Sequence, residues 1–216
     1  MTMSRSGETK RVRLSPDERR LQLITLGAEL LAERALEDIS VEEIAKQAGI
    51  SRGLLFHYFD SKHDFHEAIA RHVSVEFLAA IAPNHSLGLF DMLRDSVERY
   101  VDYVEENGAA YRAILRGPSS VYPGMLTYVN ESRSAIAELV LAEAPIAADD
   151  PDRPRLTLAL RGWMAFVEET ILTWMSEKPI TRTELIDLLV ESLPSLTLSP
   201  VLSAALRAAT PETLPG

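Results

Sequence analysis

Residues 51–58 combine side chains that can contact both the bases and the backbone of double-stranded DNA. One face of the short helix expected here carries an arginine, a gap at glycine, a leucine and two polar aromatic side chains: Arg52, Gly53, Leu54, His57 and Tyr58. A helix of this kind fits the major groove, where an arginine can donate two hydrogen bonds to a guanine. Arg52 is therefore the leading candidate for reading a base, and such a pair is worth about 1–3 kcal/mol of discrimination. The alternative is a solvated arginine on a helix pair that serves packing alone.

The neighbouring residues predict a helix-turn-helix over 41–60 that would position this face. Small and apolar residues give its first helix a buried side, and Gly49 permits the left-handed backbone conformation of the turn. Ser51 can cap the second helix. Leu55 and Phe59, four residues apart, can anchor that helix to the core.

Serine caps followed by an acidic residue three positions later mark three helix starts. They occur at Ser15, at Ser40 and, in a looser form, at Ser61. Each hydroxyl can accept a hydrogen bond from an amide of the first turn, while the carboxylate reaches back to the amide of the cap residue. The sequence therefore specifies the helix starts in this region well.

The stretch ISVEEIAKQAGISRGLLFHYFDSKHDF resembles the DNA-binding domain of the TetR family of transcriptional regulators, and the match covers about residues 16–66. The resemblance implies a homodimer that binds a near-palindromic operator and represses transcription until a small molecule binds the C-terminal domain. The positions that it assigns to DNA comprise a phosphate-contacting cap, the start of the recognition helix and residues near the backbone: Ser40, Ser51, Arg52, Gly53, Leu54, His57, Tyr58 and Lys62.

Three positions depart from the pattern of that family. Ala35 stands where a glycine usually ends the first helix, so we expect the turn there to be strained or rearranged. Phe56 replaces a tyrosine whose hydroxyl would reach a phosphate. Leu54 replaces a commonly polar base-contacting residue, so it can meet a thymine methyl group but cannot hydrogen-bond.

Three histidines near the motif form no recognisable set of metal ligands. His63 and His66 share a helix face with Glu67 adjacent, whereas His57 lies on the preceding helix and faces outward. We therefore expect no metal and no cofactor.

The second half of the chain gathers aromatic residues and methionines that can line a cavity for a bulky hydrophobic effector, such as a fatty acyl compound. Rings, methionines and a few orienting hydroxyls are typical of ligand cavities. The candidate lining is Tyr100, Tyr103, Tyr111, Tyr122, Met125, Tyr128, Trp163, Met164, Val167 and Glu168. Each of these residues taken singly is better explained as core, and the family resemblance is what favours a cavity among them.

Glu168 lies among large apolar residues of the helix expected at 155–177. A carboxylate that points into the cavity would favour a cationic or hydroxyl-bearing ligand. The alternative is an ion pair with an arginine of another helix, such as Arg112 or Arg161, and this structural pair is slightly preferred.

The helix expected at 181–193 is apolar nearly all round, so we expect a second surface of it to be covered. In the resembled family this helix and the preceding one pair across a twofold axis as a four-helix bundle. The candidate interface residues are Thr170, Thr173, Leu185, Leu188 and Leu189. The twofold axis would also place two recognition helices in successive major grooves.

These elements make an all-α protein, because apolar residues recur at three and four positions and no alternating strand pattern occurs. Helices are expected at 16–34, 41–48, 52–59, 62–82, 87–106, 109–116, 124–144, 155–177 and 181–193, with a short tenth at 200–209. The predicted domains are a disordered basic arm at 1–14, a helix-turn-helix DNA-binding domain at 15–62, and an effector-binding and dimerisation domain at 63–216. The helix that starts at Lys62 is expected to link them.

Net charge alone would argue against a nucleic-acid partner. The 216 residues carry 22 basic and 32 acidic side chains, a formal charge of −10. Residues 1–62, however, hold ten of each sign, so the whole excess lies in residues 63–216. The acidity therefore indicates which end of the chain meets DNA.

Composition excludes several other classes of protein. The chain has no cysteine, no apolar run long enough to span a bilayer and no apolar signal segment at its start, so we expect a cytoplasmic protein without membrane contact. It has no phosphate loop, metal motif or nucleophile elbow to support a helical enzyme, and we expect none. A transcriptional activator, and a DNA-binding module without a small-molecule effector, stay open.

Overall fold

The computed structural model describes residues 14–31, 33–116, 123–144, 146–197 and 204. These residues form eight α-helices and one 3₁₀ helix, and they contain no strand, so the all-α fold is confirmed. The elements are α1 (Pro16–Leu30), η1 (Leu36–Asp38), α2 (Val41–Gln47), α3 (Arg52–Leu55), α4 (Lys62–Ala80), α5 (Leu89–Arg116), α6 (Pro123–Glu143), α7 (Arg153–Glu177) and α8 (Arg182–Thr197).

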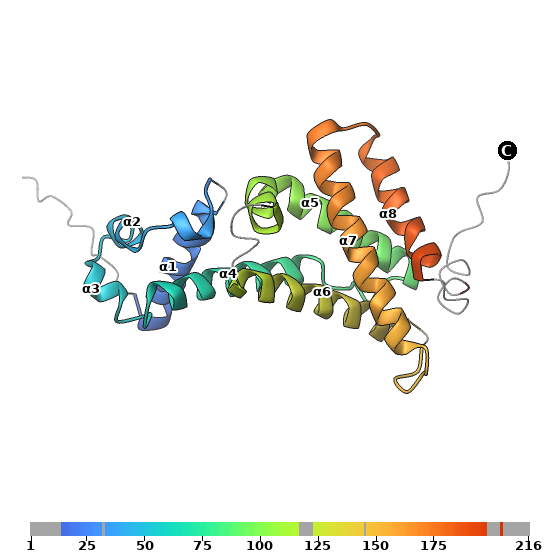
Figure 1. The fold of residues 1–216 in the computed structure, drawn as a ribbon, viewed down its shortest axis with the longest axis horizontal. Coiled ribbons are helices and arrows are strands. Elements are labelled where there is room, and N and C mark those ends of the chain that lie inside the picture. The colour runs from blue at the N-terminus through green and yellow to red at the C-terminus, as the bar shows by residue number, and fades with distance from the viewer. Residues whose placement is uncertain (1–13, 32, 117–122, 145, 198–203, 205–216) are drawn as a thin grey trace, which may run out of the picture.

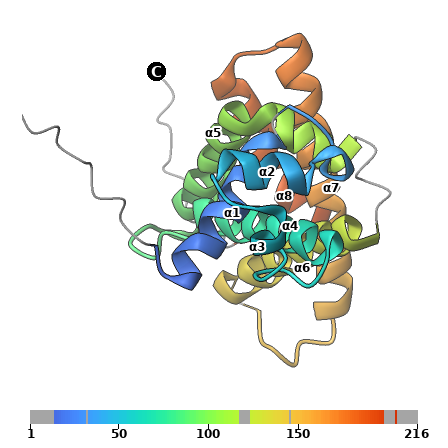
Figure 2. The ribbon, with the colours of Figure 1, turned by 90° about the vertical axis from the view of Figure 1, so that its left-hand side faces the viewer.

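The helices form an elongated molecule with α1, α2 and α3 at one end and α7 and α8 at the other (Figure 1). Helix α4 starts beside α3 and runs along the long axis, with α6 packed against it. Viewed from the end, α1, α2 and α3 lie in front of the remaining helices (Figure 2). One helix, α4, thus belongs to both parts of the molecule.

The N-terminal helices pack around a closed apolar core. Leu23, Ile44, Leu55 and Ile69 have no exposed surface, and Phe59 has only 1%. The starts of α1, α2, α3 and α4 are all serine-capped as predicted. In α1, for example, the amide of Glu18 donates to Ser15 Oγ at 3.2 Å. These caps satisfy amides that would otherwise lack partners.

Helices α1 and α4 cross closely at Gly27. A Cβ atom added there would lie 2.3 Å from Cδ1 of Ile69, well inside van der Waals contact. The missing side chain therefore lets the two backbones approach and fixes how α4 leaves the N-terminal core.

The end of the first helix differs from the prediction. Helix α1 ends at Leu30 rather than at residue 34, and a 3₁₀ turn that the sequence did not predict follows at η1. Ala35 has φ −66° and ψ 152°, an ordinary extended backbone, so the expected strain is absent. The chain turns early because Leu36, the first residue of the 3₁₀ helix, and Ile39, the residue that follows it, are both buried in the core.

Three other helix boundaries also differ. The α-helical part of α3 covers only Arg52–Leu55, and hydrogen-bonded turns continue it, with the amide of Tyr58 donating to the Leu55 carbonyl at 2.9 Å. The segments predicted as separate helices at 87–106 and 109–116 form α5, kinked at Asn107. Helix α8 continues past 193 to Thr197 despite Pro194. The predicted arm at 1–14 and helix at 200–209 lie outside the described residues, apart from 14 and 204.

Helix α8 is buried mainly in the core of its own chain. Its apolar residues Leu185, Ile186, Leu189, Val190 and Leu193 are each at most 2% exposed, whereas Leu188 is 44% exposed. The expectation that one-sided burial cannot account for this helix is therefore wrong, because packing against α5 and α7 covers all of these residues except Leu188. None of the described helices has the length and continuous hydrophobicity needed to cross a bilayer.

Candidate DNA interface and effector cavities

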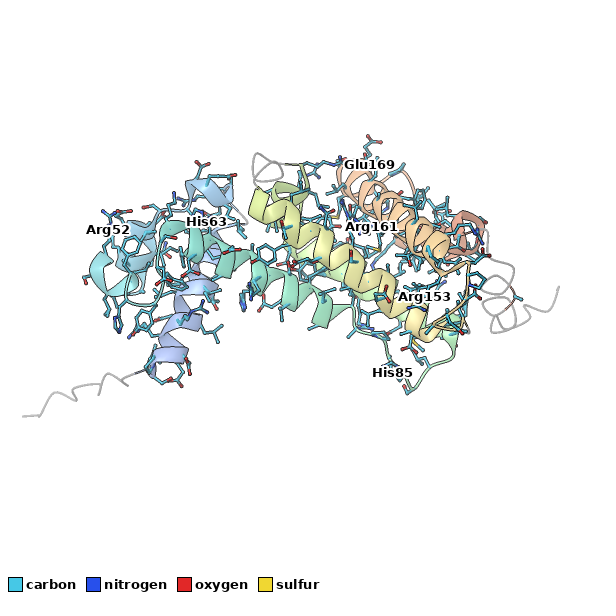
Figure 3. All side chains as sticks on the ribbon, turned by 60° about the horizontal axis from the view of Figure 1, so that its bottom comes forward. Arg52, His63, His85, Arg153, Arg161 and Glu169 are labelled. Atoms are coloured by element: carbon cyan, nitrogen blue, oxygen red, sulfur yellow. The ribbon has the colours of Figure 1, made fainter. Side chains whose placement is uncertain are left out.

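The four residues that open the recognition helix are all exposed: Ser51, Arg52, Gly53 and Leu54. They lie at the end of the molecule farthest from α7 and α8, where the Arg52 side chain projects outward (Figure 3). Leu55 is fully buried and holds this helix to the core. The sequence-predicted division of α3 into a buried side and a free side is therefore present.

Arg52 is held by two neighbours that orient its guanidinium group. Its Nη1 lies 3.0 Å from Oε1 of Glu42 on α2, and its Cζ lies 5.5 Å from the centre of the Phe56 ring. Both charged side chains are more than half exposed, so the ion pair stabilises the fold little. Phe56, a departure from the family's pattern, thus supports Arg52 through a cation–π contact that the sequence reasoning missed.

Two glycines serve the motif in different ways. Gly49 has φ 66°, so it provides the left-handed turn that the sequence predicted, and the Ile50 amide then donates to the Ala45 carbonyl at 2.9 Å. At Gly53, a Cβ atom would meet nothing closer than Ser51 Oγ at 4.0 Å. Packing within this chain therefore does not demand Gly53, which leaves room for a partner to approach the backbone.

The other predicted DNA contacts surround this helix. Ser40 caps α2 and donates to Glu42 at 3.0 Å, while Lys62 Nζ donates to the Glu37 carbonyl at 2.8 Å. His57 is exposed and packs edge-on against Tyr58, with the ring centres 5.7 Å apart. The starts of α2 and α4 thus flank α3 with polar side chains.

His66 belongs to the core rather than to a cluster of ligands. It is 4% exposed, and its Nε2 lies 3.2 Å from the Ile39 carbonyl, to which the neutral Nε2–H form donates. Burial lowers the pKa of His66 below its usual value. Within the described residues, no group of three or more His, Asp or Glu side chains could hold a metal ion.

Two cavities are bordered by residues of the predicted effector lining. The apolar cavity, about 720 Å³ including the part open to solvent, lies between the end of α4 and helices α5, α6, α7 and α8. Tyr100, Trp163 and Met164 of the predicted lining border it, together with Met92 and Leu93. Nearly all of its other lining residues are aliphatic, so it suits an apolar ligand.

The second cavity, which we call the junction cavity, is about 1070 Å³ including open space and is bordered by α1, α4, α5, α6 and α7. Tyr100, Tyr103, Tyr111 and Glu168 of the predicted lining border it. The sequence reasoning missed its remaining polar and aromatic residues: Thr25, Glu29, His72, Ser74, Glu76, Phe77, Asn107, Ser132 and Arg133. Its wall therefore includes residues of α1, in the N-terminal part of the molecule.

Glu168 both borders the junction cavity and pairs with an arginine. Its partner is Arg133 of α6, not Arg112 or Arg161. Arg133 Nε donates to Oε1 at 2.9 Å, and a second bond joins Nη2 to Oε2. The Arg133 position could have been suspected from sequence, because it falls between Val129 and Ile136 on the apolar stripe of α6.

The tyrosines of the junction cavity are uncharged hydrogen-bonding groups. The hydroxyls of Tyr100 and Tyr111 bond to each other. Burial raises the pKa of both, and it raises the pKa of Tyr103 to about 12. Each hydroxyl therefore keeps its proton at neutral pH and can orient a ligand.

The remaining candidates for the lining lie elsewhere. Tyr128 packs into the N-terminal core and accepts a hydrogen bond from Arg71 at 3.4 Å, and Val167 is fully buried without bordering either cavity. Tyr122 and the side chain of Met125 lie outside the described residues.

The candidate dimer residues divide into buried and accessible groups. Leu185 and Leu189 have no exposed surface, whereas Leu188 and Thr173 are exposed and Thr170 is half-buried. Helix α7 presents a further exposed stripe at spacings of four and three residues, made of Leu158, Gly162 and Ala165. The 72% exposure of Leu158 makes this stripe the more evident uncovered apolar surface.

Two family models match the chain. The model of bacterial regulatory proteins of the tetR family matches residues 23–69, and that of the tetracyclin repressor-like C-terminal domain matches residues 89–195. A TetR-family transcriptional regulator from Streptomyces coelicolor is 30% identical, with a TM-score of 0.77 and coverage of 94% of both chains.

More distant relatives share the fold or part of the sequence. The transcriptional activator FasR from Mycolicibacterium smegmatis is 28% identical over 137 residues, which span 62% of this chain and 62% of FasR. FadR from Bacillus subtilis, whose structure is in complex with stearoyl-CoA, is 17% identical, with a TM-score of 0.58 over 80% of this chain and 96% of FadR; this likeness shows the fold alone. The similar proteins named above are regulators rather than enzymes. The chain belongs to the TetR family of DNA-binding transcriptional regulators.

Proposed function

We propose that this regulator is a repressor, released from its operator when a bulky, mainly hydrophobic small molecule occupies the cavities of its second half. The observation that carries the proposal is the course of α4. This helix starts at Lys62, beside the recognition helix, and its segment from His72 to Phe77 borders the junction cavity. A ligand in that cavity therefore touches the same helix that positions α3.

The release needs no new charge or bond. A ligand that fits one packing of α4, α5 and α6 better than another shifts the population toward the packing that it binds more tightly. The ratio of the ligand's affinities for the two packings sets the size of this shift. Because Gly27 holds α4 closely against α1, displacement of α4 moves the N-terminal helices with it. In a dimer, this movement changes the separation of the two recognition helices and thus their fit to successive major grooves.

A homodimer through α7 and α8 is part of the proposal. The exposed stripe at Leu158, Gly162 and Ala165, with Leu188 on α8, supports it, because an uncovered apolar surface is typical of an interface. Light scattering at micromolar concentration should give a dimer, and Gly162→Arg should give a monomer that keeps its helical content. A monomeric wild-type protein would contradict this assignment.

Selection of bound DNA from random oligonucleotides tests the assignment of Arg52. Arg52→Ala should lower operator affinity by about 1–3 kcal/mol, roughly 5- to 150-fold, and relax the preference at one base pair in each half-site. Arg112→Ala removes an exposed arginine from the other half and serves as the control, with affinity unchanged. Equal affinity and preference for Arg52→Ala and wild type would show that Arg52 reads no base.

Native mass spectrometry of the purified protein tests for an effector. A co-purified small molecule, added back to stripped protein, should weaken operator binding. A ligand that binds tightly without changing operator affinity would contradict release.

Activation of transcription is a second candidate for the role of this regulator. FasR, with which the chain shares 28% identity, is named as a transcriptional activator. A reporter gene placed behind the selected operator separates the two roles. A repressor lowers expression in the absence of ligand, whereas an activator raises it.

A further inference from the structure

The apolar cavity and the junction cavity are adjacent. Tyr100 and Ile136 border both of them, so these two side chains form the partition between the cavities. Neither cavity is closed off from solvent. A single elongated ligand can therefore occupy both cavities if the Tyr100 ring turns aside.

The two cavities differ in charge. Only Ser96 and Glu143 interrupt the hydrocarbon and aromatic lining of the apolar cavity. The junction cavity has three carboxylates, those of Glu29, Glu76 and Glu168, against one arginine, Arg133. His72 also borders it, with Nε2 3.2 Å from Oε1 of Glu76. The junction cavity is thus the polar one, and its balance of charge is acidic.

The aromatic rings of the junction cavity add a second attraction for a positive group. Phe77 lies at their centre, 5.0 Å from Tyr100 and 5.2 Å from Tyr103 between ring centres. Ring faces attract cations electrostatically, and more strongly where water is excluded. Carboxylates and ring faces therefore act in the same direction.

The unequal burial of Glu168 and Arg133 decides which charge a ligand can bring. The side chain of Glu168 is 10% exposed, whereas that of Arg133 is 26% exposed. A cationic ligand can take the place of the Arg133 guanidinium, which then returns to water while Glu168 keeps a partner. An anionic ligand would have to displace Glu168, whose carboxylate has no comparable access to solvent, and an unpaired buried charge is costly.

We propose that the effector is a cationic amphiphile. Its hydrocarbon body fills the apolar cavity, and its ammonium group lies in the junction cavity among Glu168, Glu76 and the rings around Phe77. This inference rests on the proposed function, since it names the chemical class of the effector that the function requires. It also replaces the expectation of a fatty acyl compound by that of a ligand with a positively charged head group.

Isothermal titration calorimetry with three probes of equal chain length tests the head group. The probes are dodecyltrimethylammonium, dodecanol and dodecanoate, each used below the concentration at which it aggregates. The cationic probe should bind about tenfold or more tightly than dodecanoate, with dodecanol between them. Equal affinities, tighter binding of dodecanoate, or no binding of the cationic probe would overturn the proposal.

Variants that each remove one charge from the junction cavity locate the head group. Glu168→Gln should weaken the cationic probe about tenfold and strengthen dodecanoate, because it leaves Arg133 unpaired. Arg133→Gln should have the opposite effect on both. Dodecanol should change little in either variant and serves as the control for folding. Glu76→Gln, at a more exposed side chain, repeats the test if the first pair does not fold. If the relative affinities of the probes were the same in all three variants as in the wild type, the head group would lie elsewhere and the proposal would be overturned.

Operator binding measured with the same probes separates the two proposals. Release by dodecanol and dodecanoate as readily as by the ammonium compound overturns the cationic class but leaves a ligand-released repressor. Selective binding of the ammonium compound without any change in operator affinity supports the class and contradicts ligand release.

Discussion

The two ends of this molecule differ in how closely their side chains are packed. Around α1, α2 and α3, fully buried side chains and a close helix crossing at Gly27 fill the core, and serine caps define the helix starts. Between α4 and α8, the helices are longer and border two cavities, one of which is lined by the ion pair of Glu168 and Arg133. A DNA-reading surface needs fixed geometry, whereas a ligand-accepting core needs space that the bare protein leaves unfilled. The difference predicts that equivalent changes have unequal effects in the two ends.

The largest effect is expected from truncating a leucine of the N-terminal core. Leu23→Ala should lower the free energy of unfolding by about 2–5 kcal/mol, because it opens a cavity where Leu23 now has no exposed surface. Leu93→Ala, at the apolar cavity, should cost about 1 kcal/mol or less, since its neighbours already border empty space. Urea unfolding of both variants measures the contrast. Equal losses would show that the two cores are packed alike.

A smaller loss is expected from adding one methyl group at the α1–α4 crossing. Gly27→Ala should cost about 1–3 kcal/mol, because its Cβ would lie 2.3 Å from the buried tip of Ile69. Adding Ile69→Val removes that tip and should recover part of the loss. Gly53→Ala, at an open surface position, is the control and should be neutral or slightly stabilising. Thermal unfolding that ranks Gly27→Ala with Gly53→Ala would contradict the close crossing.

A pH-dependent loss of stability is expected from the N-terminal core. Burial lowers the pKa of His66, so the unfolded chain binds a proton near pH 6.5 while the native chain resists it. Stability should therefore fall as the pH drops below about 6.5, by at most about 1.4 kcal/mol per pH unit from this residue. His66→Gln keeps a donor for the Ile39 carbonyl and should remove this part of the slope. An unchanged slope in denaturant titrations from pH 7.5 to 5.5 would assign the effect to other groups.

The smallest effect concerns the separation of charge between the two ends. Glu42→Gln should raise operator affinity a few fold, because it frees Arg52 from the 3.0 Å ion pair and removes a negative charge near the phosphates. Glu177→Gln removes the same charge from the far half, beyond a screening length of about 8 Å, and should leave affinity unchanged at physiological salt. Fluorescence anisotropy with a labelled operator compares the two. A gain for Glu177→Gln equal to that for Glu42→Gln would show that net charge, not position, controls binding.

The local signals in the sequence predicted the N-terminal end well. A serine cap, a left-handed glycine and a pair of apolar residues four apart act within a few residues, so they define α2, the turn at Gly49 and α3. The end of α1 was missed because it depends on Leu36 and Ile39 entering a core built from distant helices. Capping and helical periodicity depend only on residues close in sequence, so they carry no information about that core.

Burial in the second half was harder to predict, because an apolar residue there can fill the core or line a cavity. Tyr100 and Tyr128 have the same residue type, and each is followed by a valine. Tyr100 borders both cavities, whereas Tyr128 lies in the N-terminal core beside Arg71. The placement depends on how α5 and α6 lie against α4, which no local pattern encodes.

The sequence by itself determined the all-helical architecture, the TetR-type motif and the exposed face that carries Arg52, because helical periodicity and capping are local. Only the tertiary structure decided that Glu168 pairs with Arg133, that Phe56 supports Arg52, and that two cavities meet at Tyr100. Each of these joins residues of different helices, or depends on the rotamer of a side chain. Their free energies depend on burial and distance, and both arise only when the helices pack.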